Sequence, residues 1–376
     1  MTTQDSQAIA RLRLPLAVGV VFIHLGMGFS GRQIHWQSFG EMDAFRFLGC
    51  FVTNELASLA VPLFFVISGY LFFANMPVDG NRAMLATYGH KLRRRVRSLL
   101  VPYLIFNILA AAALIINKVI DGYSLQQAAE LYLGGMKWLR NFWDIHTTGT
   151  AINVLGISRA VAYPLDSPLW FVRDLMVLVI MSPVIYYALR WLRWGWLALM
   201  VVLTLTGIWI PLPGFGVSSC LYFSIGAWFS ITRLSMGESL RRWRWWLLLI
   251  ALPAMLADIW SDGTEFDQYF HLLALISGLL CVYAFVANSN HGIPVPSWCA
   301  PASFFVFAVH TLPIPWLGCR PVEWCKSLLW TDSSNIWRCI GEFFATGLLA
   351  AAICAAAYVL LHMIVPSLAN VLTGRK

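Results

Sequence analysis

The feature that most constrains this chain is a succession of apolar runs, each long enough to cross a lipid bilayer as a helix. Spanning a hydrocarbon core about 30 Å thick takes about 20 apolar residues. Runs of this kind begin near Leu14, Leu56, Ser98, Leu169, Trp194, Val217, Trp245, Tyr269, Ser303 and Trp337. The sequence therefore predicts an all-α, polytopic transmembrane helix bundle of about ten spans, with both termini cytoplasmic.

Composition supports the same class. Of the 376 residues, 59% are hydrophobic and only 12% are charged, whereas soluble domains carry about 25% charged residues. The first run begins directly after MTTQDSQAIARLRL, without a cleavage signal, so we expect a retained anchor. No shift in composition marks a second unit. We expect residues 1–376 to form a single integral-membrane domain, with an outer loop at about 118–168 that contains an interfacial helix.

The basic charge of the chain follows its predicted topology. The formal net charge is +8, which by itself would be compatible with a nucleic-acid partner. With the N-terminus inside, however, the inner segments hold more Lys and Arg than the outer loops, as the positive-inside rule requires. We therefore expect no nucleic-acid partner, and contacts with membrane lipids instead.

The first span carries an arginine and a histidine eleven residues apart, Arg13 and His24. Eleven helical steps return to within about 20° of the starting direction and rise about 16 Å along the axis. The spacing predicts Arg13 at the water boundary and His24 near the centre of the membrane, on one face. Ionisable groups at that depth usually face a cavity, a partner or a substrate. The alternative is a histidine that only hydrogen-bonds a neighbouring helix.

A basic run, Lys91–Arg97, precedes the third span on the predicted inner side. Arg94 and Arg97 lie three residues apart, so a helix presents them on one face, where they could grip phosphate. The alternative is a topology signal that touches lipid phosphates.

Two further spans carry candidate pocket residues. The small pair Ser68 and Gly69 interrupts a bulky helix, which lets another backbone or a ligand come close, and packing is the more usual reason. His310 lies well inside the ninth predicted span.

The fourth span opens with the segment Pro168–Asp174, which contains Trp170. Its Arg173 and Asp174 sit at the rim of the hydrocarbon, where each needs a partner. Adjacent residues point apart on a helix, so we expect each to pair with another helix.

No motif indicates a metal or a bound cofactor. The eight cysteines form no CxxC pair, and the sequence contains no HExxH, no Walker-type loop and no dinucleotide glycine pattern. Cys319, Cys325 and Cys339 fall in or beside one outer loop, where a disulfide would need an oxidising compartment.

These motifs together resemble the acyltransferase-3 family of polytopic membrane acyltransferases. The resemblance rests on Arg13-x10-His24, on Phe64–Leu71, on Arg94-x2-Arg97 before Pro102-Tyr103, on Leu169–Leu175 and on the segment that ends at His310. It implies about ten helices, an acyl-CoA donor at the inner face, an acceptor often at the outer face, and essential roles for Arg13 and His24. Two departures stand out: the family often has Tyr before its late histidine and Pro after it, where this chain has Phe307 and Thr311, and the esterase-like extension of some members is lacking.

We expect a membrane O-acyltransferase, specifically an O-acetyltransferase, that moves an acyl group from acyl-CoA to a hydroxyl of a cell-surface glycan or glycan precursor. His24 would act as general base or carry the acyl group briefly, and both roles stay open. Arg94 and Arg97, completed by Arg13, would hold the donor, while Ser68, Gly69, Trp170 and His310 are pocket candidates. Acetyl-CoA is the expected donor substrate, with a carbohydrate or lipid-linked acceptor, in the bacterial inner membrane. The alternatives are a non-catalytic transporter or flippase for a glycan or small polar substrate, and a membrane scaffold.

Overall fold

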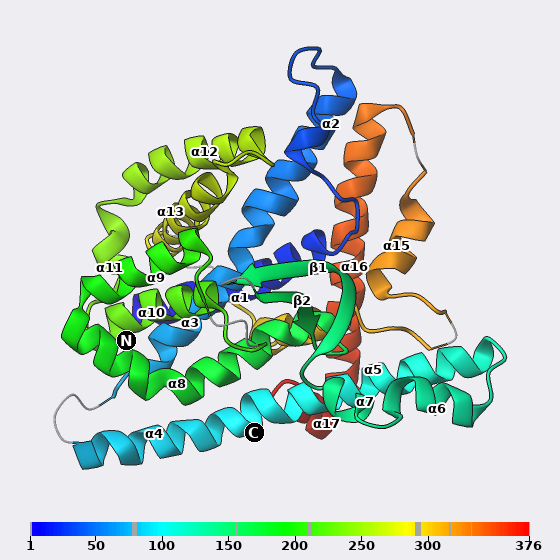
Figure 1. Cartoon of the computed structure of the whole chain (residues 1–376), viewed down its shortest axis with the longest axis horizontal. Coiled ribbons are helices and arrows are strands. Elements are labelled where there is room, and N and C mark those ends of the chain that lie inside the picture. The colour runs from blue at the N-terminus through cyan, green and yellow to red at the C-terminus, as the bar shows by residue number, and fades with distance from the viewer. Residues whose placement is uncertain are drawn as a thin grey trace.

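The computed structural model describes residues 2–76, 81–154, 157–209, 213–289, 295–315, 317–331 and 333–375. These residues form a bundle of helices with one two-stranded hairpin (Figure 1). In this view α12 and α13 lie at the upper left, α10 and α3 lie below them, and α1 runs from there towards α15 and α16 on the right.

Seven helical stretches among the described residues are long and apolar enough to cross a membrane. They contain α1 (Thr3–Ile23), α2 with α3 (Glu41–Cys50 and Ala60–Phe73), α4 with α5 (Asn81–Arg95 and Val101–Ile120), α8 (Trp170–Leu192), α12 (Arg244–Ser261), α13 (Asp267–Ala287) and α16 (Ile336–Ile364). The π-helical segments η2 (Phe51–Leu56) and η4 (Val96–Leu100) and the 3-10 segment η3 (Ala57–Leu59) join the paired helices into continuous ones. The prediction of a multi-pass membrane protein is confirmed.

The other three predicted spans are helical but short. They are α9 (Trp194–Thr206), α10 (Val217–Ile231) and α14 (Cys299–Val309), each below 18 residues. All ten apolar runs are therefore helices, of which seven reach spanning length by themselves.

The predicted outer loop is more structured than expected. It contains α6 (Leu125–Leu133), the single turn α7 (Lys137–Arg140), and an antiparallel hairpin of β1 (Ile145–Val154) and β2 (Ile157–Tyr163). Helix α6 begins at a capping box formed by Ser124 and Gln127. The hairpin adds two strands to the all-α prediction.

Short elements complete the chain. They are η1 (Gly31–Gln33), η5 (Ser167–Leu169), α11 (Met236–Arg241), α15 (Pro321–Leu329) and α17 (Pro366–Leu372). All eight cysteines are free.

Helices α3 and α10 cross at two glycines. A Cβ added to Gly69 would lie 2.1 Å from the carbonyl oxygen of Phe223, and one added to Gly226 would lie 1.8 Å from that of Val66. Only glycine permits so close an approach of two backbones. Gly69 therefore fixes the packing of α3 on α10 at the centre of the bundle.

A buried carboxylate ties the start of α1 to three other segments. Asp5 is fully buried and accepts hydrogen bonds from the hydroxyls of Tyr70 (2.7 Å), Tyr283 (2.9 Å) and Ser235 (2.9 Å) and from the backbone N–H of Gly237 (2.9 Å). Burying a carboxylate is costly unless donors satisfy it, and this one is well supplied. The contact holds α1 in place against α3, α11 and α13.

The expectation that Arg173 and Asp174 would pair with other helices rather than with each other holds only in part: Asp174 accepts a hydrogen bond from Ser219 of α10, but the two residues also pair with each other. The Arg173 Nη2 and Asp174 Oδ1 atoms lie 3.0 Å apart, and both side chains are buried. Adjacent Cβ atoms diverge on a helix, but the long arginine side chain bends back far enough to close the ion pair. Arg173 also donates to the carbonyl oxygen of Trp143 at 2.6 Å, which fastens the outer segment to α8.

Candidate active site

A cavity of about 300 Å³ lies between α1, α3, η4, α8, α14 and the C-terminal segment, and we call it the arginine cavity. Its basic lining consists of Arg13 from α1, Arg95 from the end of α4 and Arg375 from the C-terminal segment. Ser68 adds a hydroxyl from α3. The apolar lining includes the rings of Phe64, Phe171, Phe304 and Phe307.

Positive charge in this cavity is not matched by carboxylates. Among the described residues that line it, none is Asp or Glu. Arg13 lies within electrostatic range of both Arg95 and Arg375. Crowded guanidinium groups without acidic partners are typical of an anion-binding site, and phosphate suits their forked geometry.

The basic run contributes to this cavity through a residue that the sequence did not single out. Arg94 and Arg97 are exposed, whereas Arg95 is partly buried and lines the cavity. Arg94 and Arg97 share a helical face, and Arg95 points about 100° away from Arg94. The structure thus brings Arg13 together with Arg95, and leaves the predicted clamp pair on the surface.

The two predicted histidines meet. His24 caps the C-terminal end of α1, and His310 caps that of α14. Their ring centroids are 5.1 Å apart with an interplanar angle of 53°. Sequence spacing predicted His24 inside a helix, but α1 ends at Ile23, and Arg13 lies at the midpoint of that helix. Positive φ angles at Gly26 and Gly28 lead the chain away from α1.

His310 has one ring nitrogen available for chemistry. The side chain is completely buried, and its Nδ1 lies 3.1 Å from the carbonyl oxygen of Val306. That contact favours the tautomer with hydrogen on Nδ1, which leaves Nε2 as an acceptor. Nε2 is buried and has no hydrogen-bond partner among the described residues. A substrate hydroxyl is the kind of group that would satisfy it.

The arginine cavity and the histidine pair share a wall. Phe307 lines the cavity, and its ring centroid lies 6.4 Å from that of His310. Helix α1 connects the same two places, since it carries Arg13 into the cavity and ends beside His24. Neither histidine lines the cavity, so the two places adjoin through Phe307 and α1.

The sequence analysis did not identify Asp166, which is a buried acid beside the histidine pair. Its Oδ1 lies 3.4 Å from the hydroxyl of Thr311, the residue that follows His310, and its backbone N–H donates to the side chain of Asn107. Burial raises the pKa of Asp166 well above its usual value. Nothing in the sequence around Asp166 distinguishes it from other loop acids.

Of the remaining predicted pocket residues, some line the arginine cavity and others only pack against neighbouring helices. Ser68 lines the arginine cavity, whereas the neighbouring Gly69 packs on α10. Trp170 contacts Phe65 with ring centroids 6.4 Å apart, and its neighbour Phe171 lines the cavity. Among the described residues, no group of three or more His, Cys, Asp or Glu side chains could hold a metal ion.

Comparison with known proteins places the chain in a family. The acyltransferase-3 family model, described as an acyltransferase domain, matches residues 7–362. The succinoglycan biosynthesis protein ExoH of Rhizobium meliloti (strain 1021) is 24% identical to the chain over 388 aligned residues, which cover 100% of this chain and 94% of that protein. No solved structure matches significantly.

Proposed function

We propose that this chain, which belongs to the acyltransferase-3 family, transfers an acetyl group from acetyl-CoA to a hydroxyl of a cell-surface glycan or glycan precursor. The family makes it a transferase of acyl groups other than aminoacyl groups. The donor, the acetyl group and the acceptor are the proposed part. The observation that carries the proposal is the arginine cavity, whose lining residue Phe307 lies beside His310 of the histidine pair.

The arginine cavity suits a coenzyme A thioester. The donor has phosphates at one end and a narrow pantetheine arm that ends in the thioester. Arg13, Arg95 and Arg375 supply guanidinium groups for phosphate, and the phenylalanine rings line a path for the arm. The rise from Arg13 to His24 is about 16 Å, which is comparable to the length of the arm. Arg94 and Arg97 remain candidates for phosphate contacts at the surface.

His24 then supplies base catalysis. Its imidazole takes the proton from an acceptor hydroxyl while the hydroxyl oxygen attacks the thioester carbonyl carbon. The carbon–sulfur bond breaks, the coenzyme A thiolate leaves, and the proton passes from the imidazolium to the thiolate. In the second route, the His24 nitrogen attacks the thioester carbonyl carbon, the carbon–sulfur bond breaks and the coenzyme A thiolate leaves. The acceptor hydroxyl then attacks the acetyl carbon, the bond from that carbon to the His24 nitrogen breaks, and the hydroxyl proton passes to the thiolate. His310, 5.1 Å away, helps in either route by holding the acceptor or the His24 ring.

A glycan acceptor is supported by the relative that covers the whole chain. That protein is named for the biosynthesis of succinoglycan, a polysaccharide. We place the protein in a bacterial inner membrane with about ten spans and both termini in the cytoplasm, where acetyl-CoA is available. The acceptor would then meet the donor inside the bundle.

A non-catalytic transporter or flippase is the rival function. It would need no donor, so the decisive experiment supplies radiolabelled acetyl-CoA to the purified protein in lipid nanodiscs. We expect the protein to bind acetyl-CoA and to hydrolyse it slowly without an acceptor, because water replaces the sugar hydroxyl. No binding and no hydrolysis, repeated with longer acyl-CoA donors, would favour the transporter.

A further inference from the structure

A second cavity, of about 750 Å³, lies among the start of α1, the end of α11, the start of α12 and the end of α13, and we call it the basic groove. Its lining contains Arg11 of α1, Arg241 and Arg242 at the end of α11, and Arg244 at the start of α12. Arg11 lies two residues before Arg13 and points to the opposite side of α1. The groove shares no lining residue with the arginine cavity.

The positive charge of the basic groove has no acidic counterpart. Among the described residues that line it, none is Asp or Glu, and none of its arginines forms an ion pair. The nearby carboxylate of Asp5 is occupied by three hydroxyls and a backbone N–H. Glu238 of α11 is exposed and does not line the groove. Guanidinium groups gathered in this way favour an anion, and phosphate suits their forked donors.

Hydrogen bonds fix the wall of the groove. The side-chain amide of Gln4 donates to Oδ1 of Asn288 at 3.0 Å, and Nδ2 of Asn288 donates to the carbonyl oxygen of Gly237 at 3.0 Å. Arg11 donates from Nη1 to the hydroxyl of Ser289 at 3.1 Å. These contacts join the start of α1 to α11 and to the end of α13.

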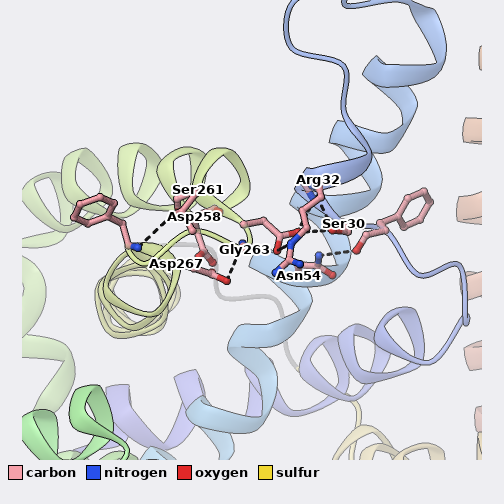
Figure 2. A network of polar contacts seen from close by, with 12 residues as sticks. Ser30, Arg32, Asn54, Asp258, Ser261, Gly263 and Asp267 are labelled. Atoms are coloured by element: carbon pink, nitrogen blue, oxygen red, sulfur yellow. Dashed lines mark hydrogen bonds and ion pairs between the residues drawn. The ribbon is translucent and has the colours of Figure 1, made fainter. Parts of the chain in front are cut away.

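The hairpin of α12 and α13 is also fixed at its far end. There the Gly263 N–H donates to Asp267 at 3.2 Å, and Arg32 of η1 forms an ion pair with Asp262 at 3.3 Å (Figure 2). The hairpin is thus held both at its turn and beside the groove. A site held in this way needs little ordering when a ligand binds, which lowers the entropic cost of binding.

An exposed apolar stripe leads away from the groove along α12. Trp245 lines the groove and is 61% exposed. Its face of α12 continues with four exposed apolar side chains at intervals of three or four residues, Leu249, Leu252, Leu256 and Trp260. The stripe rises about 22 Å along the helix. Because α12 is long and apolar enough to cross a membrane, acyl chains of lipids are the natural neighbours of this face.

We propose that the basic groove binds the phosphate group of an anionic glycerophospholipid, whose acyl chains lie along the apolar stripe of α12. A soluble phosphate compound would satisfy the arginines but leave the stripe unused, whereas a phospholipid meets both. Aromatic rings flank one of the cations: the Arg244 guanidinium carbon lies 5.5 Å from the ring centroid of Trp245 and 5.8 Å from that of Phe285. A topology signal needs only positive charge on one side of the membrane, and no shared cavity.

The test measures which lipids the full-length protein retains. The protein is placed in nanodiscs made from equal parts of phosphatidylglycerol and phosphatidylcholine with identical acyl chains, and native mass spectrometry identifies the lipids that stay bound on release. Wild type should retain phosphatidylglycerol about tenfold more often than phosphatidylcholine. Arg241→Gln and Arg244→Gln should each lower this preference about fivefold, because one arginine near an anionic lipid contributes about 1 kcal/mol.

Arg93→Gln is the matched control. Arg93 carries the same charge, is exposed on α4 and lines neither cavity, so its loss should leave the preference unchanged. The preference separates recognition from a merely structural role, since a loosened fold would lose both lipids alike. Inorganic phosphate in large excess distinguishes a lipid from a soluble phosphate compound. It should leave phosphatidylglycerol bound, because phosphate cannot occupy the stripe.

Four results would overturn the proposal. Wild type would retain the two lipids equally, or both groove variants would keep the preference of wild type. Alternatively, Arg93→Gln would lower the preference as much as the groove variants, which is the result expected from net charge alone. Displacement of phosphatidylglycerol by inorganic phosphate would assign the groove to a soluble phosphate compound instead. The inference does not depend on acetyl transfer, so either can fail without the other.

Discussion

The chemistry proposed here depends on two side chains at the ends of two helices. His24 and His310 lie far apart in the sequence, yet their ring centroids are 5.1 Å apart. His310 is fully buried and holds its Nδ1 on the carbonyl oxygen of Val306, whereas His24 is only partly buried. A mobile substrate reaches a partly buried ring more easily than a fully buried one. We therefore assign proton transfer or acyl transfer to His24 and a positioning role to His310.

Glutamine substitutions separate these two roles. Glutamine keeps one hydrogen bond but neither accepts a proton near neutral pH nor attacks a thioester. His24→Gln should reduce acetyl transfer by about a hundredfold or more, the usual contribution of a general base, while acetyl-CoA still binds. His310→Gln should retain measurable transfer with a raised KM for the acceptor. Steady-state kinetics with radiolabelled acetyl-CoA gives both values.

The reverse pattern, an active His24→Gln and an inactive His310→Gln, would exchange the two assignments. A His24→Gln protein that no longer binds acetyl-CoA would indicate a structural role for His24 in the arginine cavity.

At the scale of single residues, the sequence singled out the two histidines but did not predict which side chains they would contact. The sequence predicted both His24 and His310 well inside membrane spans, and both predictions are wrong, because α1 ends at Ile23 and α14 ends at Val309. The meeting of the two histidines depends on where α1 and α14 end and on how they pack, which no local pattern records. Asp166 was missed for the same reason, because its burial comes from distant segments, including Thr311.

Among the elements, the continuous helix from α4 through η4 to α5 decides which arginines can reach the donor. The sequence predicted the face that carries Arg94 and Arg97, on the ground that residues three apart point together. In the structure that face is exposed, and Arg95 turns into the cavity beside Arg13. Spacing alone identifies residues that share a face but not which face meets the bundle.

Alanine substitutions along this helix test the assignment. Arg95→Ala should raise the KM for acetyl-CoA by about ten- to a hundredfold, because one charge-assisted contact to phosphate is worth about 1.5–3 kcal/mol. Arg95→Lys should restore only part of the loss, since an ammonium cannot reproduce the guanidinium fork. Arg94→Ala and Arg97→Ala are the matched controls and should have smaller effects. A larger effect at Arg94 or Arg97 than at Arg95 would show that the phosphates bind at the surface.

The helices themselves were largely predictable, since each of the ten apolar runs is a helix. The hairpin of β1 and β2 was not, because the outer segment has no regular alternation of apolar residues to mark it. The role of Gly69 could not be predicted, because the sequence allowed either a ligand or another backbone beside it. The close approach of Phe223 on α10 shows that Gly69 packs against a backbone.

For the whole molecule, helix α1 joins the proposed donor cavity to the histidine pair. Arg13, Arg95 and Arg375 line the arginine cavity beside the middle of α1, and His24 lies at the C-terminal end of the same helix. In a membrane with both termini in the cytoplasm, this order brings acetyl-CoA from the inner face. The acceptor sugar would then approach from the other side of the histidine pair.

The most direct test is to measure from which side of the membrane the protein uses acetyl-CoA. Membrane vesicles of both orientations, inside-out and right-side-out, are given radiolabelled acetyl-CoA on their outer surface only, and the label incorporated into glycan is measured. We predict that wild-type protein incorporates label in inside-out vesicles and gives only background in right-side-out vesicles. In inside-out vesicles at low donor concentration, the His24→Gln and Arg95→Ala proteins should lose this incorporation. Equal or greater incorporation in right-side-out vesicles would contradict the placement of the donor, and no wild-type incorporation in either orientation would contradict the proposed transfer.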